Sequence, residues 1–210
     1  MGAGTGVFTR QLLQAGFEVH AVEPNPDMRQ EAEASLSHMP GFASIAATAE
    51  ATTLPTHTLD AISCAQAFHW FDSDMVIPEF RRILKPGGPV CLIWNNQRFG
   101  SDPFHRDYEA ALIRGCPAYA QFDLAAISYD APKLKSLFDA GRVDPYRFDN
   151  AQVLDLEGLQ GRISSVSYCP PAGSQAHQTL MSEVEALFDT HQRNGVVRIL
   201  YDVEMYVIRF

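Results

Sequence analysis

Apolar and polar residues in the first half of the chain follow two spacings in turn. Short, mostly apolar runs predict strands, which lie at residues 17–22, 42–47, 59–64 and 89–94. Apolar residues at helical spacing, followed by glycine or proline, predict helices at residues 7–13, 27–37 and 76–84. Because parallel strands need long crossover connections, this alternation predicts a doubly wound α/β sheet with helices on both faces.

The second half carries a weaker pattern. It predicts helices at residues 103–114, 132–140 and 180–188, a strand tail over 152–156 that leads into a further helix, and a final strand or hairpin over 196–210. No internal repeat or linker divides the chain. Residues 1–210 are therefore predicted to form a single domain, with a core over 1–97 and substrate-side helices and last strands over 98–210.

Charge narrows the range of partners. The chain has 210 residues, a formal net charge of −9 and scattered basic residues. Since nucleic-acid binding depends on clustered Lys and Arg, this balance argues against a nucleic-acid partner and favours a small-molecule substrate. The densest basic group, Arg81, Arg82 and Lys85, is interpreted as one solvated helix face. The oligomeric state stays open.

The sequence shows neither a membrane span nor a metal-binding pattern. No apolar stretch reaches the roughly 18 residues that a membrane helix needs, and no charged-then-apolar leader precedes the first helix. Cys64, Cys91, Cys116 and Cys169 lie far apart, without a C-x-x-C pair or a histidine at zinc-ligand spacing. We therefore expect no metal site, inert buried thiols at Cys64 and Cys91, and a location in the reducing cytoplasm.

A glycine-rich turn opens the first predicted helix and consists of Gly2, Ala3, Gly4, Thr5 and Gly6. Glycines let the backbone approach a ligand closely, and the free N–H groups of a helix start favour polar or anionic atoms. A dinucleotide fingerprint, G-x-G-x-x-G, would place its third glycine where Val7 stands. The turn therefore disfavours a nicotinamide cofactor.

Glu23 ends the strand predicted at residues 17–22 and follows Gly2 by 21 residues. A carboxylate in this place can accept hydrogen bonds from both hydroxyls of a ribose. The alternative is a solvated loop glutamate beside a glycine-rich helix cap. The spacing favours the nucleoside interpretation.

Together these residues resemble the class I S-adenosylmethionine-dependent methyltransferases, whose glycine loop reads G-x-G-x-G and whose next strand ends in an acidic residue. Other segments are also similar to the family: Thr48-Ala49-Glu50-Ala51 with Leu54-Pro55, Leu59-Asp60-Ala61-Ile62, and the most specific one, Arg82-Ile83-Leu84-Lys85-Pro86-Gly87-Gly88. The resemblance implies a Rossmann-like sheet and S-adenosylmethionine as cofactor, bound by Gly2, Ala3, Gly4, Thr5, Gly6, Glu23, Ala49, Glu50 and Gln66. Many members carry Asp where Thr48 stands, which leaves the adenine contact to the Ala49 backbone and Glu50.

Within the family, residues 65–71 and 164–170 resemble a subgroup that includes small-molecule methyltransferases of the trans-aconitate type. This likeness implies a small-molecule methyl acceptor in a pocket lined by Phe68, Trp70, Trp94, Asn95 and Tyr168. Whether oxygen, nitrogen or carbon is methylated stays open, because fold does not fix substrate.

The resemblance implies in-line attack by the acceptor on the sulfonium methyl. Alignment can supply as much as ~7–11 kcal/mol, so a general base is optional. His69 is the candidate base, because it follows the strand at 59–64 and has a near-neutral pKa; alternatively it belongs to an aromatic wall with Trp70 and Phe71. Two other functions stay open: a cofactor-binding remnant without catalysis, and an NAD-dependent oxidoreductase.

In the family, a strand that ends just before the glycine loop lies between the strands predicted at 17–22 and 59–64. The chain starts where that strand should end. We therefore expect the first central strand to be missing or truncated. Three explanations stay open: Met1 is an internal methionine of a longer gene product, which we favour, the two flanking strands close directly on each other, or the fragment folds poorly.

Overall fold

The computed structural model describes residues 1–117, 119, 129–165 and 169–210, which form two compact units. The first unit comprises Met1–Trp94, Tyr129–Arg147 and Glu204–Phe210. The second comprises the described residues of Asn95–Ser128 and Phe148–Val203. The assignment of residues 1–210 to one domain stays a prediction.

The first unit alternates helices with short strands in the order that the sequence predicts. Its elements are α1 (Val7–Gln14), β1 (Val19–Val22), α2 (Pro26–Leu36), β2 (Phe42–Ile45), β3 (Ile62–Ala65), a short 3-10 turn (Phe68–Trp70), α3 (Ser73–Ile83), β4 (Val90–Gln97) and α5 (Ala131–Leu137). β4 runs on into the second unit. Local sequence explains the helix starts: Asn25 caps α2 and Asp72 caps α3 through side-chain oxygens that accept backbone N–H groups. The predicted α/β alternation is confirmed.

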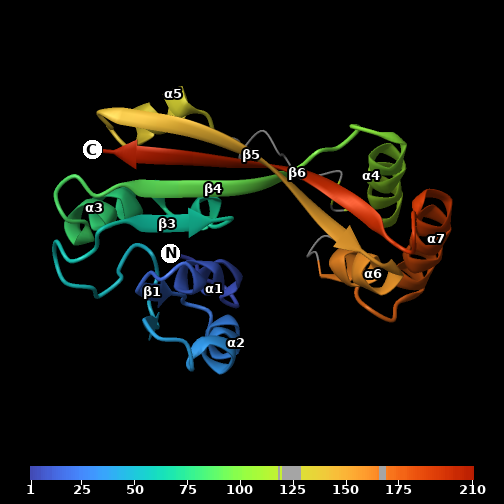
Figure 1. The fold of residues 1–210 in the computed structure, drawn as a ribbon, viewed down its shortest axis with the longest axis horizontal. Helices are drawn as coiled ribbons and strands as arrows, with labels where there is room; N and C mark the ends of the chain where they lie inside the picture. The colour runs from blue at the N-terminus through green and yellow to red at the C-terminus, as the bar shows by residue number, and fades with distance from the viewer. Residues whose placement is uncertain (118, 120–128, 166–168) are drawn as a thin grey trace. The chain divides into compact units, whose positions relative to one another are not determined.

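The strands form two sheets (Figure 1). β1 and β2 pair in parallel, with Val19 opposite Phe42. β3 and β4 also pair in parallel, with Ile62 opposite Val90, in a sheet of order β3-β4-β6-β5. β5 (Arg142–Leu154) and β6 (Val197–Arg209) each contribute residues to both units. The parallel pairs require the crossovers that α2 and α3 supply.

The start of the chain is hydrogen-bonded to one strand of each sheet. The backbone N–H of Ala3 donates to the carbonyl of Val22 in β1 at 3.0 Å. The Met1 amino group donates to the carbonyl of Ser63 in β3 at 2.8 Å. The absence of the family's first central strand stays a prediction, but these bonds fix the glycine loop at the carboxyl end of β1.

The core of the first unit is apolar and closely packed. Phe68, Phe80, Ile83 and Leu92 are fully buried, and Phe138 from the α5 end contacts the Phe68 ring. Burial raises the pKa of Cys64 to about 11, so its thiol stays protonated at neutral pH, as expected of an inert core cysteine. Burial also raises the pKa of Cys91.

The second unit is built around three helices that share an apolar core: α4 (Pro103–Gly115), α6 (Leu156–Ser164) and α7 (Gln175–His191). α7 extends the helix predicted at residues 180–188 at both ends, and the hydroxyl of Ser174 caps it. The buried His105 accepts the Leu200 backbone N–H at Nε2, so its proton lies on Nδ1, 2.9 Å from Asp102 Oδ1.

Cys116 and Cys169 form a disulfide with their Cα atoms 4.6 Å apart. The two residues are 53 positions apart in the chain, so no local sequence pattern predicts that they pair. Cytoplasmic location stays a prediction, and disulfides that persist are more typical of oxidising compartments.

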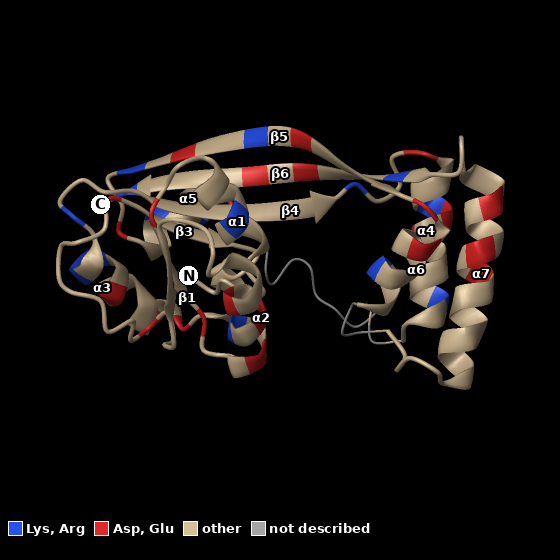
Figure 2. Ribbon diagram, turned by 60° about the horizontal axis from the view of Figure 1, so that its bottom comes forward, with Lys and Arg blue, Asp and Glu red and all other residues tan. Residues whose placement is uncertain are grey.

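Charged residues are mixed over most elements (Figure 2). The acidic helix α7 is an exception, with Glu183, Glu185 and Asp189 but neither Lys nor Arg. Arg81 and Lys85, two of the three cations expected on a solvated face, are exposed and Arg82 is partly exposed. Each also has a partner: Arg81 donates to the Phe138 carbonyl, Arg82 binds Glu79 and Lys85 binds Asp60. Among the described residues, no helix is long and apolar enough to cross a membrane.

Candidate functional site

The glycine loop and Glu23 are joined directly. The Gly4 N–H donates to Oε2 of Glu23 at 2.8 Å, and the Asn25 N–H donates to Oε1 at 2.9 Å. Glu23 is only 7% exposed, so both bonds act on a largely desolvated carboxylate. A carboxylate has about four lone-pair sites, and two further donors can therefore bind the same group.

The three glycines of the loop have positive φ angles but different surroundings. A Cβ at Gly2 (φ 62°) would lie 2.6 Å from Ala67 Cβ, and one at Gly6 (φ 85°) would lie 2.5 Å from Leu36 Cδ1. A Cβ at Gly4 (φ 56°) would meet nothing within 4 Å. Gly2 and Gly6 are thus required by packing, whereas Gly4 borders an open space beside the Glu23 carboxylate.

Two further loops meet this turn. Gly2 packs against Ala67 and the Phe71 ring, which belong to the loop after β3. In the loop after β2, Ala49 is buried, and Oε1 of Glu50 accepts the Asp72 N–H at 3.1 Å. The glycine loop, Glu23, the 48–54 loop and the 66–72 loop are therefore linked by direct contacts at the carboxyl ends of β1, β2 and β3, where open α/β sheets bind ligands.

An ion pair between the buried Glu79 and the partly exposed Arg82 holds the 48–54 loop on α3. Oε1 of Glu79 accepts both the N–H (2.9 Å) and the hydroxyl (2.5 Å) of Thr52. Arg82 binds the same carboxylate through Nε at 2.7 Å and Nη2 at 2.8 Å. Hydrogen bonds from Arg82 and then from Thr52 lower the pKa of Glu79 to about 2, against the opposing effect of burial.

An aromatic cluster surrounds Trp94 in β4. Trp94, 6% exposed, stacks on Tyr129 with ring centroids 5.1 Å apart, and Tyr206 contacts its edge at 6.0 Å. The Tyr206 hydroxyl donates to the Tyr129 carbonyl at 3.0 Å. Within the described part of the chain, the buried Nε1 of Trp94 has no hydrogen-bond partner. Buried indole N–H groups normally have one, so this donor is available to a ligand.

The residues of the 3-10 turn differ in burial. Phe68 is buried and contacts Tyr129 and Phe71, whereas Trp70 is 75% exposed. His69 is half-buried, and its buried Nδ1 atom has no partner among the described residues. Burial lowers the pKa of His69, so the neutral imidazole predominates at pH 7 and can accept a proton.

Four predicted site residues, Thr5, Gln66, Asn95 and Tyr168, take no part in the hydrogen bonds and ring contacts described above. Thr5 and Gln66 are exposed, although Gln66 has a positive φ of 54° and its N–H binds the Ile93 carbonyl at 2.9 Å. Asn95 belongs to the second unit, where its Oδ1 accepts from Asn150 Nδ2 at 3.2 Å. Tyr168 lies outside the described residues. Sequence reasoning missed Tyr129, Tyr206 and the Thr52–Glu79 contact, although Glu79 stands on the apolar face of α3 with Val76, Phe80 and Ile83.

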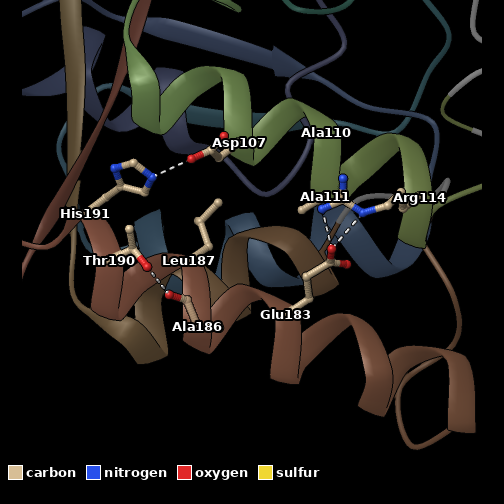
Figure 3. A pocket seen from close by; sticks show the side chains of 9 residues that line it. All are labelled: Asp107, Ala110, Ala111, Arg114, Glu183, Ala186, Leu187, Thr190 and His191. Atoms are coloured by element: carbon tan, nitrogen blue, oxygen red, sulfur yellow. Dashed lines mark hydrogen bonds and ion pairs between the residues drawn. The ribbon is translucent and has the colours of Figure 1, made fainter.

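A separate cavity of about 250 Å³ lies between α4 and α7 (Figure 3). A hydrogen bond between His191 Nε2 and Asp107 Oδ2 (2.7 Å) and an ion pair between Arg114 and Glu183 border it. None of its lining residues is a predicted cofactor or acceptor residue. In the described part of the chain, no cluster of three or more His, Cys, Asp or Glu residues is suited to a metal ion.

Comparison with known proteins gives consistent matches. Residues 1–92 match the model of a family described as "Methyltransferase domain". An uncharacterized methyltransferase from Mycobacterium tuberculosis is 31% identical over 191 residues, which cover 91% of this chain and 72% of that protein. An uncharacterized methyltransferase-like protein from Schizosaccharomyces pombe is 35% identical over 194 residues, which cover 92% and 73%.

Solved structures share the fold. A proposed type II methyltransferase from Anaeromyxobacter dehalogenans matches with a TM-score of 0.73 and 22% identity over 99% of this chain and 87% of that one. A phosphoethanolamine N-methyltransferase from Haemonchus contortus, solved with S-adenosylhomocysteine, matches with a TM-score of 0.55 and 14% identity over 99% and 47%.

The ion pair of Glu79 predicts a specific loss of stability in acid. A carboxyl whose pKa is lower in the folded state stabilises the fold above its unfolded value, near 4.5, and loses that contribution as the pH falls towards about 2. We expect the free energy of unfolding to fall over this window, and to fall less steeply in Glu79→Gln. Urea titrations at stepped pH measure both slopes; equal slopes for the two proteins would contradict the prediction.

Proposed function

The chain belongs to the methyltransferase family, and from this premise we propose that it transfers the methyl group of S-adenosylmethionine to a nucleophilic atom of a small-molecule acceptor. The observation that supports this most strongly is the contact between the Gly4 N–H and the Glu23 carboxylate. It joins the two features that a nucleoside-binding loop needs, close backbone approach and a carboxylate for the ribose.

The glycine loop, Glu23 and the 48–54 loop have the chemistry that S-adenosylmethionine requires. We assign Gly2, Ala3, Gly4, Thr5 and Gly6 to the glycine loop around it, with the open side of Gly4 facing the methionine part. Glu23 keeps acceptor sites for both ribose hydroxyls while it holds Gly4 and Asn25. The Ala49 backbone and Glu50 contact the adenine, and Gln66 closes the site from the loop after β3.

The bound cofactor supplies an activated methyl group on a sulfonium, and the protein supplies alignment. Trp94 offers its indole N–H, which has no partner among the described residues, to an oxygen of the acceptor, and Phe68 and Trp70 line the same pocket. The roles of Asn95 and Tyr168 stay predictions from the sequence. Neutral His69 accepts the proton that the nucleophile releases, because its Nδ1 has no other partner in the described structure. The likeness of residues 65–71 to the trans-aconitate-type subgroup supports a small-molecule acceptor.

Calorimetry with S-adenosylhomocysteine tests the cofactor assignment. Glu23→Gln should weaken binding about 10- to 100-fold, because hydrogen bonds to a charged group contribute ~1.5–3 kcal/mol. Gly4→Ala should also weaken binding by filling the open space beside Glu23. Gly16→Ala is the matched control, since Gly16 also has a positive φ (88°) and open surroundings but lies after α1, away from the proposed site.

Gly4→Ala and Gly16→Ala should lower the free energy of unfolding by similar amounts. If only Gly4→Ala loses affinity, the added methyl group interferes with the bound ligand and not with the fold. Absence of heat with the wild-type protein would overturn the proposed function. Equal affinities for wild type, Glu23→Gln and Gly4→Ala would place the nucleoside elsewhere.

Transfer from radiolabelled S-adenosylmethionine to a panel of small carboxylic acids, amines and phenols tests the acceptor side. For any panel member that is methylated, Trp94→Phe should raise the acceptor KM about tenfold through loss of one hydrogen bond and leave the KM for S-adenosylmethionine unchanged. A parallel rise in both KM values would show that Trp94 acts on the fold instead. Binding of the cofactor without methylation of any panel member would support the non-catalytic remnant.

A further inference from the structure

The 48–54 loop is attached to α3 at two separate points. At the start of the helix, Glu50 accepts the N–H of the capping residue Asp72. Two turns further along the helix, Glu79 accepts both polar groups of Thr52. Ala49 and Glu50 therefore have their positions set by α3, a helix whose apolar face is buried in the core.

Glu79 occupies a position that packing alone would give to an apolar residue. It lies three residues after Val76 and directly before Phe80, on the buried face of α3, and its side chain is only 9% exposed. A buried carboxylate is costly unless it is paired and fully hydrogen-bonded. Arg82 supplies the charge partner and Thr52 the remaining donors, so the position is satisfied only when the loop is in place.

The loop itself is strained at this point. Thr53 has a φ of 61°, a left-handed conformation that is unfavourable for a β-branched residue. Such strain persists only where surrounding contacts hold the backbone. The contacts here are the two bonds from Thr52 to Glu79 and a third from the Leu54 N–H to the Thr52 hydroxyl at 3.3 Å.

We infer that Glu79 is a positioning residue for the adenine subsite: through Thr52 it fixes the Ala49–Glu50 backbone in the geometry that reads the edge of the base. This inference rests on the proposed function, because it assigns adenine to that segment. Adenine presents an exocyclic amino donor beside ring acceptors, whereas hypoxanthine presents a carbonyl in place of that amine. A fixed loop with a carboxylate and backbone groups distinguishes the two bases; a loop released from α3 does not.

The test compares the affinities of S-adenosylhomocysteine and S-inosylhomocysteine by calorimetry. The wild-type protein is expected to prefer the adenine compound by tenfold or more. Glu79→Gln should lower the affinity for S-adenosylhomocysteine about tenfold and bring the ratio of the two affinities close to one. A merely structural role would weaken both ligands equally and leave the ratio unchanged.

Matched variants keep the result interpretable. Thr52→Val removes the hydroxyl from the other side of the contact and should reproduce the loss of base preference, whereas Thr52→Ser retains the hydroxyl and should preserve it. Asp60→Asn breaks an exposed ion pair with Lys85, beyond the same helix, and should have no effect on the ratio. If Glu79→Gln fails to fold, as judged by circular dichroism, the comparison of Thr52→Val with Thr52→Ser tests the positioning role.

The outcomes separate the two proposals. Absence of S-adenosylhomocysteine binding to the wild type would overturn the proposed function. Binding without base preference in the wild type, or a preference that persists in both Glu79→Gln and Thr52→Val, would overturn the positioning role and leave the proposed function standing.

Discussion

The hydrogen bond from the Gly4 N–H to the Glu23 carboxylate determines the geometry of the site. It connects the turn before α1 to the end of β1 and keeps the largely buried Glu23 carboxylate beside the open space at Gly4. The neighbouring glycines make this possible, because any side chain at Gly2 or Gly6 would collide with Ala67 or Leu36. The turn is thus fixed by packing on both sides and left open in its middle, where Gly4 faces free space.

The same arrangement recurs in the 48–54 loop, where a polar side chain on one element holds the backbone of another. Glu23 holds Gly4 and Asn25, and Glu79 holds Thr52. In each case a carboxylate that packing would disfavour is stabilised by backbone donors or by Arg82. The energetic cost of burying these charges is therefore tied to the correct placement of the loops that form the candidate site.

Local sequence predicts the first unit well because its strands are short, apolar and bounded by glycine or proline. Residues 42–45 and 90–94 illustrate this, and the structure joins Glu23 to the glycine loop through Gly4. β5 escaped prediction beyond residues 152–154, because most of its residues are exposed or only half-buried and no apolar alternation marks it. The Cys116–Cys169 disulfide and the stacking of Tyr129 on Trp94 join segments that are far apart in the chain. No local sequence pattern therefore predicts them. The ion pair of Arg82 with Glu79 was not predicted, because the basic residues were considered without the buried Glu79 beside them.

A crystal structure of the protein with S-adenosylhomocysteine measures the central contact directly. The expected result is that both ribose hydroxyls lie within hydrogen-bond distance of the Glu23 carboxylate while the Gly4 N–H still donates to it, with the amino-acid part of the ligand against the open side of Gly4. A nucleoside bound elsewhere, with Glu23 contacting only Gly4 and Asn25, would contradict it.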